Sequence, residues 1–262
     1  MKTEDRCVWL YAVAADSAEL QTGAAAGIGV GGGQVRAVRA AGLTAVVEDV
    51  GEDEFGAAAL RRNLEDLEWL ERTARAHHAV IEATAGNGPV VPMRLATVYS
   101  GDDSVASMLR QRADDLGEAL SRISGRSEWG VKAYASPPAD TGPDDQADAP
   151  ARSGTAYLQR RRAQLASRTD ARQAAAADAE AVHTELSQLS VAARLYPPQP
   201  PRLAGQAALM VLNAAYLVAD AQAAEFAVAV NDLTSRHRSV RLGLTGPWPP
   251  YSFVGDADTP GS

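Results

Sequence analysis

Cysteine is almost absent from this chain of 262 residues, which contains a single one at Cys7. One thiol cannot form an internal disulfide, so the chain suits a reducing compartment. The same scarcity excludes zinc sites and iron–sulfur clusters that are built mainly from cysteine ligands.

Aromatic residues are also scarce, at 5% of the chain, although 46% of all residues are hydrophobic. Much of the hydrophobic fraction is alanine, so we expect helices that pack closely through small side chains. A length of 262 residues accommodates one large domain or two ordinary ones.

Basic residues are outnumbered by acidic ones, and the formal net charge at pH 7 is −8. A chain of this charge does not present the broad basic surface that binds nucleic acid or an anionic membrane. We therefore expect no nucleic-acid partner. The arginines at 160–162 are interpreted as a solvated helix face near a domain boundary.

Long apolar runs are missing too. Residues 203–219 are apolar apart from Gln206 and Asn213, and they fall short of the roughly 20 residues of a spanning helix. Residues 7–15 form a shorter run, but the residues before it are partly acidic where a secretory signal would be basic. We interpret this run as a strand and expect no membrane segment.

The first part of the chain alternates strand and helix patterns. Apolar residues at three- and four-residue steps from Leu60 to Ala85 predict a helix with a buried face through Leu64, Leu67 and His78. Turn residues at 86–89 end this helix. Valine-rich runs bounded by turn residues predict strands at 7–13, 34–38 and 43–50.

A further strand is predicted at 90–99. Pro92 cannot donate a ladder hydrogen bond, so this strand belongs at a sheet edge, or the proline lies at its start or at a bulge. Capping residues then introduce a helix at 105–123, which Gly125 closes. The alternation of apolar and polar residues at 128–135 predicts a half-buried strand.

Residues 136–154 interrupt this order. They are rich in proline, aspartate and glycine and have no apolar period, which predicts a flexible linker. The chain after the linker contains a long helix, two strands, a helix and a last strand, predicted at 158–189, 190–196, 208–218, 221–237 and 239–245.

Strands and helices are thus mixed in both halves of the chain. The predicted fold class is α+β, with two domains, each a mostly antiparallel sheet covered by helices. The predicted boundaries are 1–135 for the N-terminal domain, 136–154 for the linker, 155–255 for the C-terminal domain with its tail, and 256–262 for a disordered end.

Few patterns suggest chemistry. The stretch "GIGVGG" (27–32) matches G-x-G-x-x-G, but a strand pattern follows it where a dinucleotide site needs a helix, so we interpret it as a flexible loop. His78 and Glu82 share a helix face but are too few for a zinc site. No nucleophile elbow, P-loop or cysteine–histidine pair is present. We predict no catalytic residue, metal or cofactor.

The stretch "GPWPPYSF" (246–253) combines prolines and large aromatic residues. Proline fixes φ at about −65° and lacks an N–H donor, which predicts a polyproline II conformation. With about three residues per turn, Trp248 and Tyr251 share one edge. A segment this apolar is not left in water. We expect it to pack back on its own chain in preference to another protein.

The run "LTGPWPPYSFV" resembles the C-terminal signature of the gas vesicle proteins GvpF and GvpL. "VWLYAV", "VVPMRLATVY", "EWGVKAY" and "GTAYLQRRR" resemble other parts of that family in the same order, and a break in its long helical stretch falls near Asp66. The resemblance covers nearly the whole chain, except the glycine-rich loop and the linker. The candidate structural or partner-binding residues are Pro92, Arg94, Thr97, Trp129, Lys132, Gly246, Trp248, Pro249, Pro250, Tyr251 and Phe253.

The resemblance implies two α+β domains, of which the second is ferredoxin-like, and a role that is not enzymatic. Members of the family are accessory proteins for building gas vesicles, which are hollow protein shells in the cytoplasm. The implied partners are the small hydrophobic shell protein GvpA and other accessory proteins. The alternative is a small-molecule-binding or enzymatic protein with a deep interdomain pocket of converging polar groups.

Overall fold

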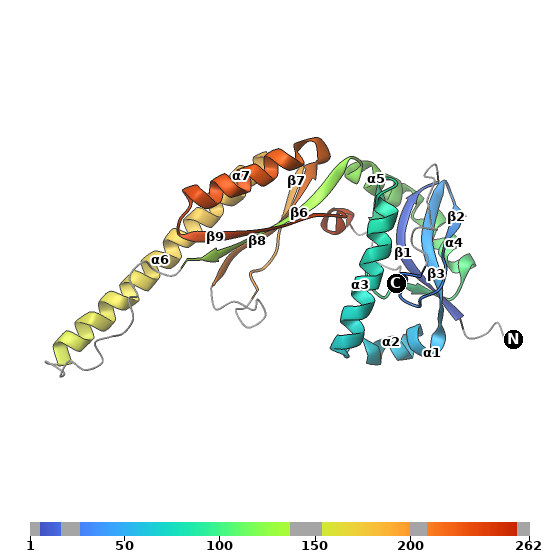
Figure 1. The fold of residues 1–262 in the computed structure, drawn as a ribbon, viewed down its shortest axis with the longest axis horizontal. Helices are drawn as coiled ribbons and strands as arrows, with labels where there is room; N and C mark the ends of the chain where they lie inside the picture. The colour runs from blue at the N-terminus through green and yellow to red at the C-terminus, as the bar shows by residue number, and fades with distance from the viewer. Residues whose placement is uncertain (1–5, 17–26, 137–153, 200–208, 256–262) are drawn as a thin grey trace. The chain divides into compact units, whose positions relative to one another are not determined.

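The computed structural model describes residues 6–16, 27–136, 154–199 and 209–255. They form two antiparallel sheets with helices packed on them, which confirms the α+β class (Figure 1). The contacts divide the chain into two compact units. Unit 1 contains residues 1–127 and 248–262, and unit 2 contains residues 128–247.

Helices cover both faces of the sheet in unit 1, whose strand order is β2-β3-β1-β4, with β5 also paired to β1. On one face Leu10 packs with residues of α4 and α5, and on the other Trp9 packs with residues of α1 to α3. The elements of unit 1 are β1 (Arg6–Ala15), β2 (Val35–Ala40), β3 (Leu43–Gly51), α1 (Glu52–Phe55), α2 (Ala57–Asn63), α3 (Leu67–Ala85), β4 (Val90–Pro92), β5 (Val98–Tyr99), α4 (Asp102–Gln111) and α5 (Ala113–Ile123).

Strand β1 lies in the middle of this sheet, and nearly all of its side chains are buried. Its sequence is a continuous apolar run because both faces of the strand meet hydrophobic clusters. The register with β3 shifts between Leu10 and Ala12. Tyr11 and Ala12 therefore both belong to the cluster under α3, which is the usual effect of a β-bulge on side-chain direction.

The helix expected from Leu60 to Ala85 is divided into α2 and α3. Asp66 caps α3, because its carboxylate accepts hydrogen bonds from two backbone N–H groups of the first turn at 2.9 and 3.3 Å. The predicted buried face is wrong at Leu64 and Leu67, which are 40% and 80% exposed. The periodicity restarts at the cap, so the buried face of α3 begins at Trp69.

Two more predicted elements are divided. The strand predicted at 90–99 consists of β4 and β5, separated by a turn in which Ala96 has a φ of 65°. Strand β4 lies at the sheet edge, as its proline predicted. The helix predicted at 105–123 consists of α4 and α5, because Arg112 leaves the helical conformation with a φ of −116°.

The sheet of unit 2 has the strand order β7-β8-β6-β9. Its elements are β6 (Arg126–Ala135), α6 (Gly154–Gln188), β7 (Ala192–Leu195), β8 (Met210–Ala219), the 3-10 helix η2 (Asp220–Gln222), α7 (Ala223–Arg236) and β9 (Val240–Trp248). This β-α-β-β-α-β order is the one found in ferredoxin-like folds. The ferredoxin-like assignment itself stays a prediction.

The two units do not follow the predicted boundaries. Residues 128–135 were expected with the N-terminal domain, but β6 pairs within the sheet of unit 2. Residues 248–255 were expected with the C-terminal domain, but they belong to unit 1. The predicted linker, except for Ser136 and Gly154 at its two ends, and the predicted disordered end at 256–262 lie outside the described residues.

Candidate functional site

Five of the candidate residues are neighbours in the C-terminal segment, which we define as residues 248–255. They are Trp248, Pro249, Pro250, Tyr251 and Phe253. The polyproline II prediction is wrong, because Val240–Trp248 is strand β9 and Tyr251–Phe253 is the 3-10 helix η3. The peptide bond between Gly246 and Pro247 is cis, and Gly246 has a φ of 118°, a conformation that glycine adopts readily.

Buried side chains attach the C-terminal segment to unit 1. Tyr251 packs against the cluster under α3, whereas Val254 belongs to the cluster under α4 and α5. Arg122 of α5 donates a hydrogen bond of 3.3 Å to the carbonyl oxygen of Phe253. The segment therefore contacts hydrophobic clusters on both faces of the sheet.

His78 of α3 lies against two of the three aromatic residues of this segment, Trp248 and Tyr251. Its ring centroid is 5.4 Å from that of Trp248 and 6.0 Å from that of Tyr251. Its Nδ1 lies 3.1 Å from the Tyr251 hydroxyl, and its Nε2 lies 3.2 Å from Glu82 Oε1. We call His78, Trp248 and Tyr251 the aromatic patch. Trp248 is 41% exposed, so the patch offers an aromatic ring to solvent.

The glycine-rich loop holds a carboxylate of the protein itself. Glu48 of β3 is fully buried, and its Oε1 accepts a hydrogen bond of 2.6 Å from the Gly33 amide. Its Oε2 accepts one of 3.3 Å from the Gly31 amide and another from the Tyr11 hydroxyl. The Val30 amide donates to that hydroxyl at 2.8 Å. Residues 27–33 form the expected loop, but the hydrogen bonds to Glu48 hold it in place, so the interpretation as flexible is wrong.

The glycines of this loop are required by the close approach of Glu48. A Cβ atom at Gly29 would overlap Glu48 Oε2, and one at Gly31 or Gly33 would lie 3.1 Å from Oε1. Successive backbone amides that surround an anion are also the basis of phosphate-binding loops. The motif matched a dinucleotide site because both need bare backbone beside an anion, and here Glu48 takes the position of the phosphate.

His77 is the second buried polar group of this region. Trp9 Nε1 donates a hydrogen bond of 2.9 Å to His77 Nδ1, so the ring proton of neutral His77 is on Nε2 and is donated to the Met93 carbonyl oxygen at 3.0 Å. The ring stacks on Tyr11 with centroids 5.3 Å apart. Burial lowers the pKa of His77 to about 4, so it stays neutral and has a structural role.

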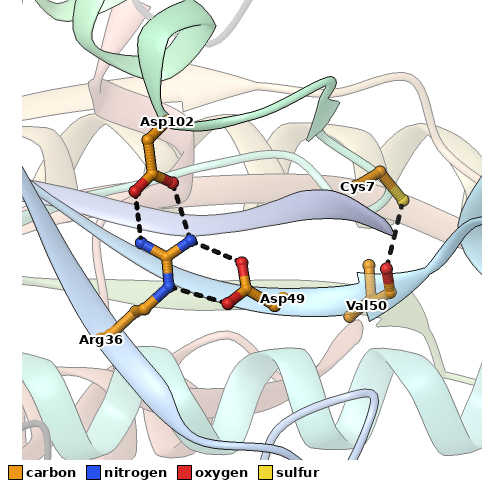
Figure 2. Close-up of polar contacts among 5 residues, drawn as sticks. All are labelled: Cys7, Arg36, Asp49, Val50 and Asp102. Atoms are coloured by element: carbon orange, nitrogen blue, oxygen red, sulfur yellow. Dashed lines mark hydrogen bonds and ion pairs between the residues drawn. The ribbon is translucent and has the colours of Figure 1, made fainter. Parts of the chain in front are cut away.

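Arg36 and Cys7, in the sheet of unit 1, also have polar partners within the protein (Figure 2). Arg36 donates to the carboxylate oxygens of Asp102 at 2.7 and 2.9 Å and of Asp49 at 2.5 and 3.1 Å. These bonds lower the pKa of Asp49. Cys7 Sγ donates to the Val50 carbonyl oxygen at 3.7 Å, and burial raises the pKa of this thiol, which makes it less reactive.

Other possible sites are weak within the described parts of the chain. No group of three or more histidine, cysteine, aspartate or glutamate side chains is placed there to hold a metal ion. None of the described helices is both long and apolar enough to span a membrane. A hollow of about 150 Å³ is lined by Leu189, Gln222, Glu225 and Phe226, which is too small for most ligands.

A sequence model of the family described as "Gas vesicle synthesis protein GvpL/GvpF" matches residues 7–255. The chain belongs to the GvpL/GvpF family. This confirms the identification made from the C-terminal run and the motifs before it. The family is one of gas vesicle proteins and is not a known enzyme family.

Individual GvpL/GvpF relatives agree with this assignment. Gas vesicle protein L of Streptomyces sp. (strain CB03234) is 43% identical over 232 residues, which cover 88% of this chain and 86% of that protein. Gas vesicle protein F of the same strain is 28% identical, with coverages of 72% and 80%. These relatives support a gas vesicle accessory role.

A solved GvpF structure supports the fold. The crystal structure of the gas vesicle protein GvpF from Anabaena sp. PCC7120 matches with a TM-score of 0.64 and 20% identity, and the match covers 95% of this chain and 96% of that one. At this identity the likeness concerns the fold alone. It agrees with two antiparallel sheets covered by helices.

The P-x-R-x-x-T motif of the GvpL/GvpF resemblance forms the turn between β4 and β5. The hydroxyl of Thr97 donates to the Arg94 carbonyl oxygen at 2.7 Å, and the Thr97 carbonyl oxygen accepts from the Leu10 amide at 2.9 Å. Pro92 and Thr97 are buried, whereas the Arg94 side chain is exposed. These contacts give Thr97 a structural part in the turn.

The remaining candidate residues are divided between the units. Trp129 is buried on β6 with its ring centroid 6.1 Å from that of Phe226, and Lys132 lies on the other face of the same strand. Pro250 is buried and Pro249 half-buried beside the aromatic patch. Glu48 and the contacts of His78 were not predicted from the sequence. The glycine spacing at 29, 31 and 33 was the available signal for Glu48.

Proposed function

We propose that this protein assists assembly of the gas vesicle shell, or is a minor component of it, by binding the small hydrophobic shell protein GvpA and other accessory proteins. The observation that carries the proposal is the family match over residues 7–255. The gas vesicle in the cytoplasm is the corresponding location. A subunit of an apolar shell needs partners that offer apolar contacts before it is built in.

The aromatic patch is the surface that suits such contacts best. Trp248 is 41% exposed, while Phe253 and Val254 nearby are buried and hold the segment in place. An exposed aromatic ring on an ordered backbone loses little conformational entropy when it binds, and tryptophan is enriched among residues that dominate binding energy. Tyr251 and Pro92 are weaker candidates for contact, because Tyr251 packs on the core and Pro92 is buried.

The test is co-purification of the tagged protein with GvpA from cells that express both. We expect the wild type to retain GvpA and Trp248→Ala to retain about tenfold less, as for loss of a central binding residue. Tyr196→Ala is the matched control, since Tyr196 is an aromatic residue of similar exposure, 37%, in unit 2. Circular dichroism checks that both variants are folded.

The possible outcomes test the proposed function and the use of the aromatic patch separately. Failure of the wild type to retain GvpA or any other gas vesicle protein would contradict the proposed function. Equal retention by the wild type and Trp248→Ala would contradict only the use of the aromatic patch. The proposed location is tested independently, by asking whether the protein is recovered with intact vesicles when these are floated by centrifugation.

A further inference from the structure

Helix α6 extends beyond the sheet of unit 2, on which its C-terminal half packs (Figure 1). From residue 158 to residue 174, every side chain that the structure describes is exposed, except the partly exposed Ala171. The buried residues of the helix begin at Ala175 and belong to the hydrophobic cluster of unit 2. The N-terminal half of this 35-residue helix is therefore surface wherever its side chains are described.

One stripe of residues runs along both halves of α6. Residues three and four positions apart are neighbours on the same face of a helix. The part of the stripe that packs on the sheet has this spacing and consists of Ala175, Ala179, Val182 and Leu186. Continued toward the start of the helix, the same spacing reaches five exposed residues, which are Leu158, Arg161, Leu165, Arg168 and Arg172. We call these five residues the exposed stripe.

The exposed stripe combines apolar and basic side chains. Leu158 and Leu165 are 57% and 51% exposed. Residues 158–174 include five arginines, and Asp170 is their single acidic residue. Asp170 is two positions from both Arg168 and Arg172, so it lies on the opposite side of the helix. The stripe is thus purely basic and apolar, on a protein whose formal net charge is −8.

These properties define the partner that fits the exposed stripe. A stripe with alternating steps of three and four residues packs against the matching stripe of a second helix, as in coiled coils. The leucines require apolar side chains opposite them, and the arginines require carboxylates. We propose that the exposed stripe binds an amphipathic helix of another protein, whose apolar residues are accompanied by glutamate or aspartate.

Charge and composition decide between this partner and its alternatives. The same stripe of a second copy would place arginine against arginine. A membrane surface requires a broad apolar face, whereas arginines separate the two leucines of the stripe. The net charge of −8 repels nucleic acid at long range. The exposed stripe is a different surface from the aromatic patch, and its use does not depend on GvpA as a partner.

The test is fluorescence anisotropy with the full chain and a fluorescein-labelled acidic peptide. The peptide consists of three heptads, with leucine and glutamate on one helix face and alanine and glutamine elsewhere. We expect binding that weakens with added salt. Leu158→Ala/Leu165→Ala should weaken it about tenfold through lost apolar contacts. Arg161→Gln/Arg168→Gln/Arg172→Gln should also weaken it about tenfold, through the loss of three exposed charge pairs. Circular dichroism checks that both variants keep their helix content.

Two matched controls distinguish a helix–helix contact from general attraction between charges. Arg61→Gln/Arg110→Gln/Arg194→Gln removes three exposed arginines outside α6 and changes the net charge by the same amount. This variant should bind the peptide like the wild type. The second control is a peptide of the same composition whose leucines and glutamates are spread around the helix, and it should bind about tenfold more weakly. The proposal is overturned if the wild type does not bind the first peptide, if the control variant loses as much affinity as the stripe variants, or if both peptides bind equally.

Three further measurements test for other occupants of the exposed stripe. Tighter binding of single-stranded DNA of the same charge than of the peptide would overturn the proposal in favour of nucleic acid. Tighter binding of vesicles that contain phosphatidylserine would overturn it in favour of a membrane surface. Self-association in sedimentation velocity that only the stripe variants abolish would overturn it in favour of a homo-oligomer.

Discussion

The two sheets of this protein differ in how many of their faces the described helices cover. Strands β1 and β6 both have 10 residues, but β1 is buried along nearly its whole length, whereas β6 alternates between buried and partly exposed positions. Both strands belong to antiparallel sheets. In the sheet of unit 2, however, β8 is buried at each position from Ala214 to Val218, so helices on one face of a sheet do not by themselves leave the other face exposed.

Burial also determines whether a polar side chain can form hydrogen bonds with water or needs a partner within the protein. In unit 1 Glu48 is fully buried and His77 is 4% exposed, and both depend on partners within the protein. In unit 2 the side chains of His237 and Asp178, whose Nδ1 and Oδ1 are 2.8 Å apart, remain 16% and 28% exposed. Burial makes the loss of a partner more costly, so unit 1 is expected to be more sensitive to polar substitutions.

The largest expected effect is that of Glu48→Ala. It leaves the Tyr11 hydroxyl and the amides of Gly31 and Gly33 without their acceptor and creates a cavity. Unsatisfied buried groups and a cavity together cost about 4 kcal/mol of the free energy of unfolding of unit 1. Urea unfolding followed by tryptophan fluorescence measures it. Glu48→Gln keeps one acceptor oxygen and should lose less; equal losses would contradict this explanation.

His77 is expected to make unit 1 sensitive to acid. Its pKa is about 4 in the folded protein, against 6.5 for a histidine free of such burial, so between these values the unfolded chain binds more protons. The contribution to stability is complete above pH 6.5 and is lost as the pH falls to 4, by about 3 kcal/mol in total.

Urea midpoints across this pH range measure the effect of His77, and His77→Gln is the comparison. Because glutamine does not titrate, the midpoint of the variant should change less over the same range. Lowered carboxylate pKa values, as at Asp49 and Asp178, affect stability mainly at lower pH. An unchanged pH dependence in His77→Gln would show that other groups cause it.

Adjacent substitutions test the difference in covering directly. Val46 and Val47 of β3 face opposite clusters and are fully buried, so each change to alanine should cost about 2–3 kcal/mol. On β6, Val131→Ala should cost a similar amount, but Lys132→Ala, on the strand face that points away from α6 and α7, less than about 0.5 kcal/mol. A large loss for Lys132→Ala would contradict the expectation that β6 contributes to the core mainly through the residues that face α6 and α7.

The sequence was sufficient for the fold class because hydrophobic periods and family motifs extend over most of the chain. Periodicity alone failed where one residue changes the path of the backbone, although the family resemblance placed a break near Asp66. Asp66 restarts a helix, Ala96 turns a strand, and Arg112 divides a helix, all within stretches whose apolar period continues. Periodicity describes which residues are apolar, but it does not show where a cap or a left-handed residue resets the phase.

Residues of the candidate site were found from motifs, but their contacts were not predictable. Nothing in the sequence links His78 to Trp248, since the contact joins α3 to a segment 170 residues later (248 − 78). The bulge at Tyr11 and the burial of Glu48 depend on pairing between strands. Long-range pairing is set by the packing of all elements together, which a local pattern does not contain.

The smallest effect is expected at the surface of unit 1. Arg36 joins β2 to Asp49 on β3 and to Asp102 at the start of α4, where a carboxylate also suits the helix N-terminus. All three side chains are 29% to 53% exposed, so solvent screening limits the cost of Arg36→Gln to about 1 kcal/mol. The loss should shrink at high salt.

Arg236→Gln, which breaks a pair with the single carboxylate Glu185 in unit 2, should cost less. If it cost as much as Arg36→Gln, bridging two carboxylates would bring no advantage over a single pair.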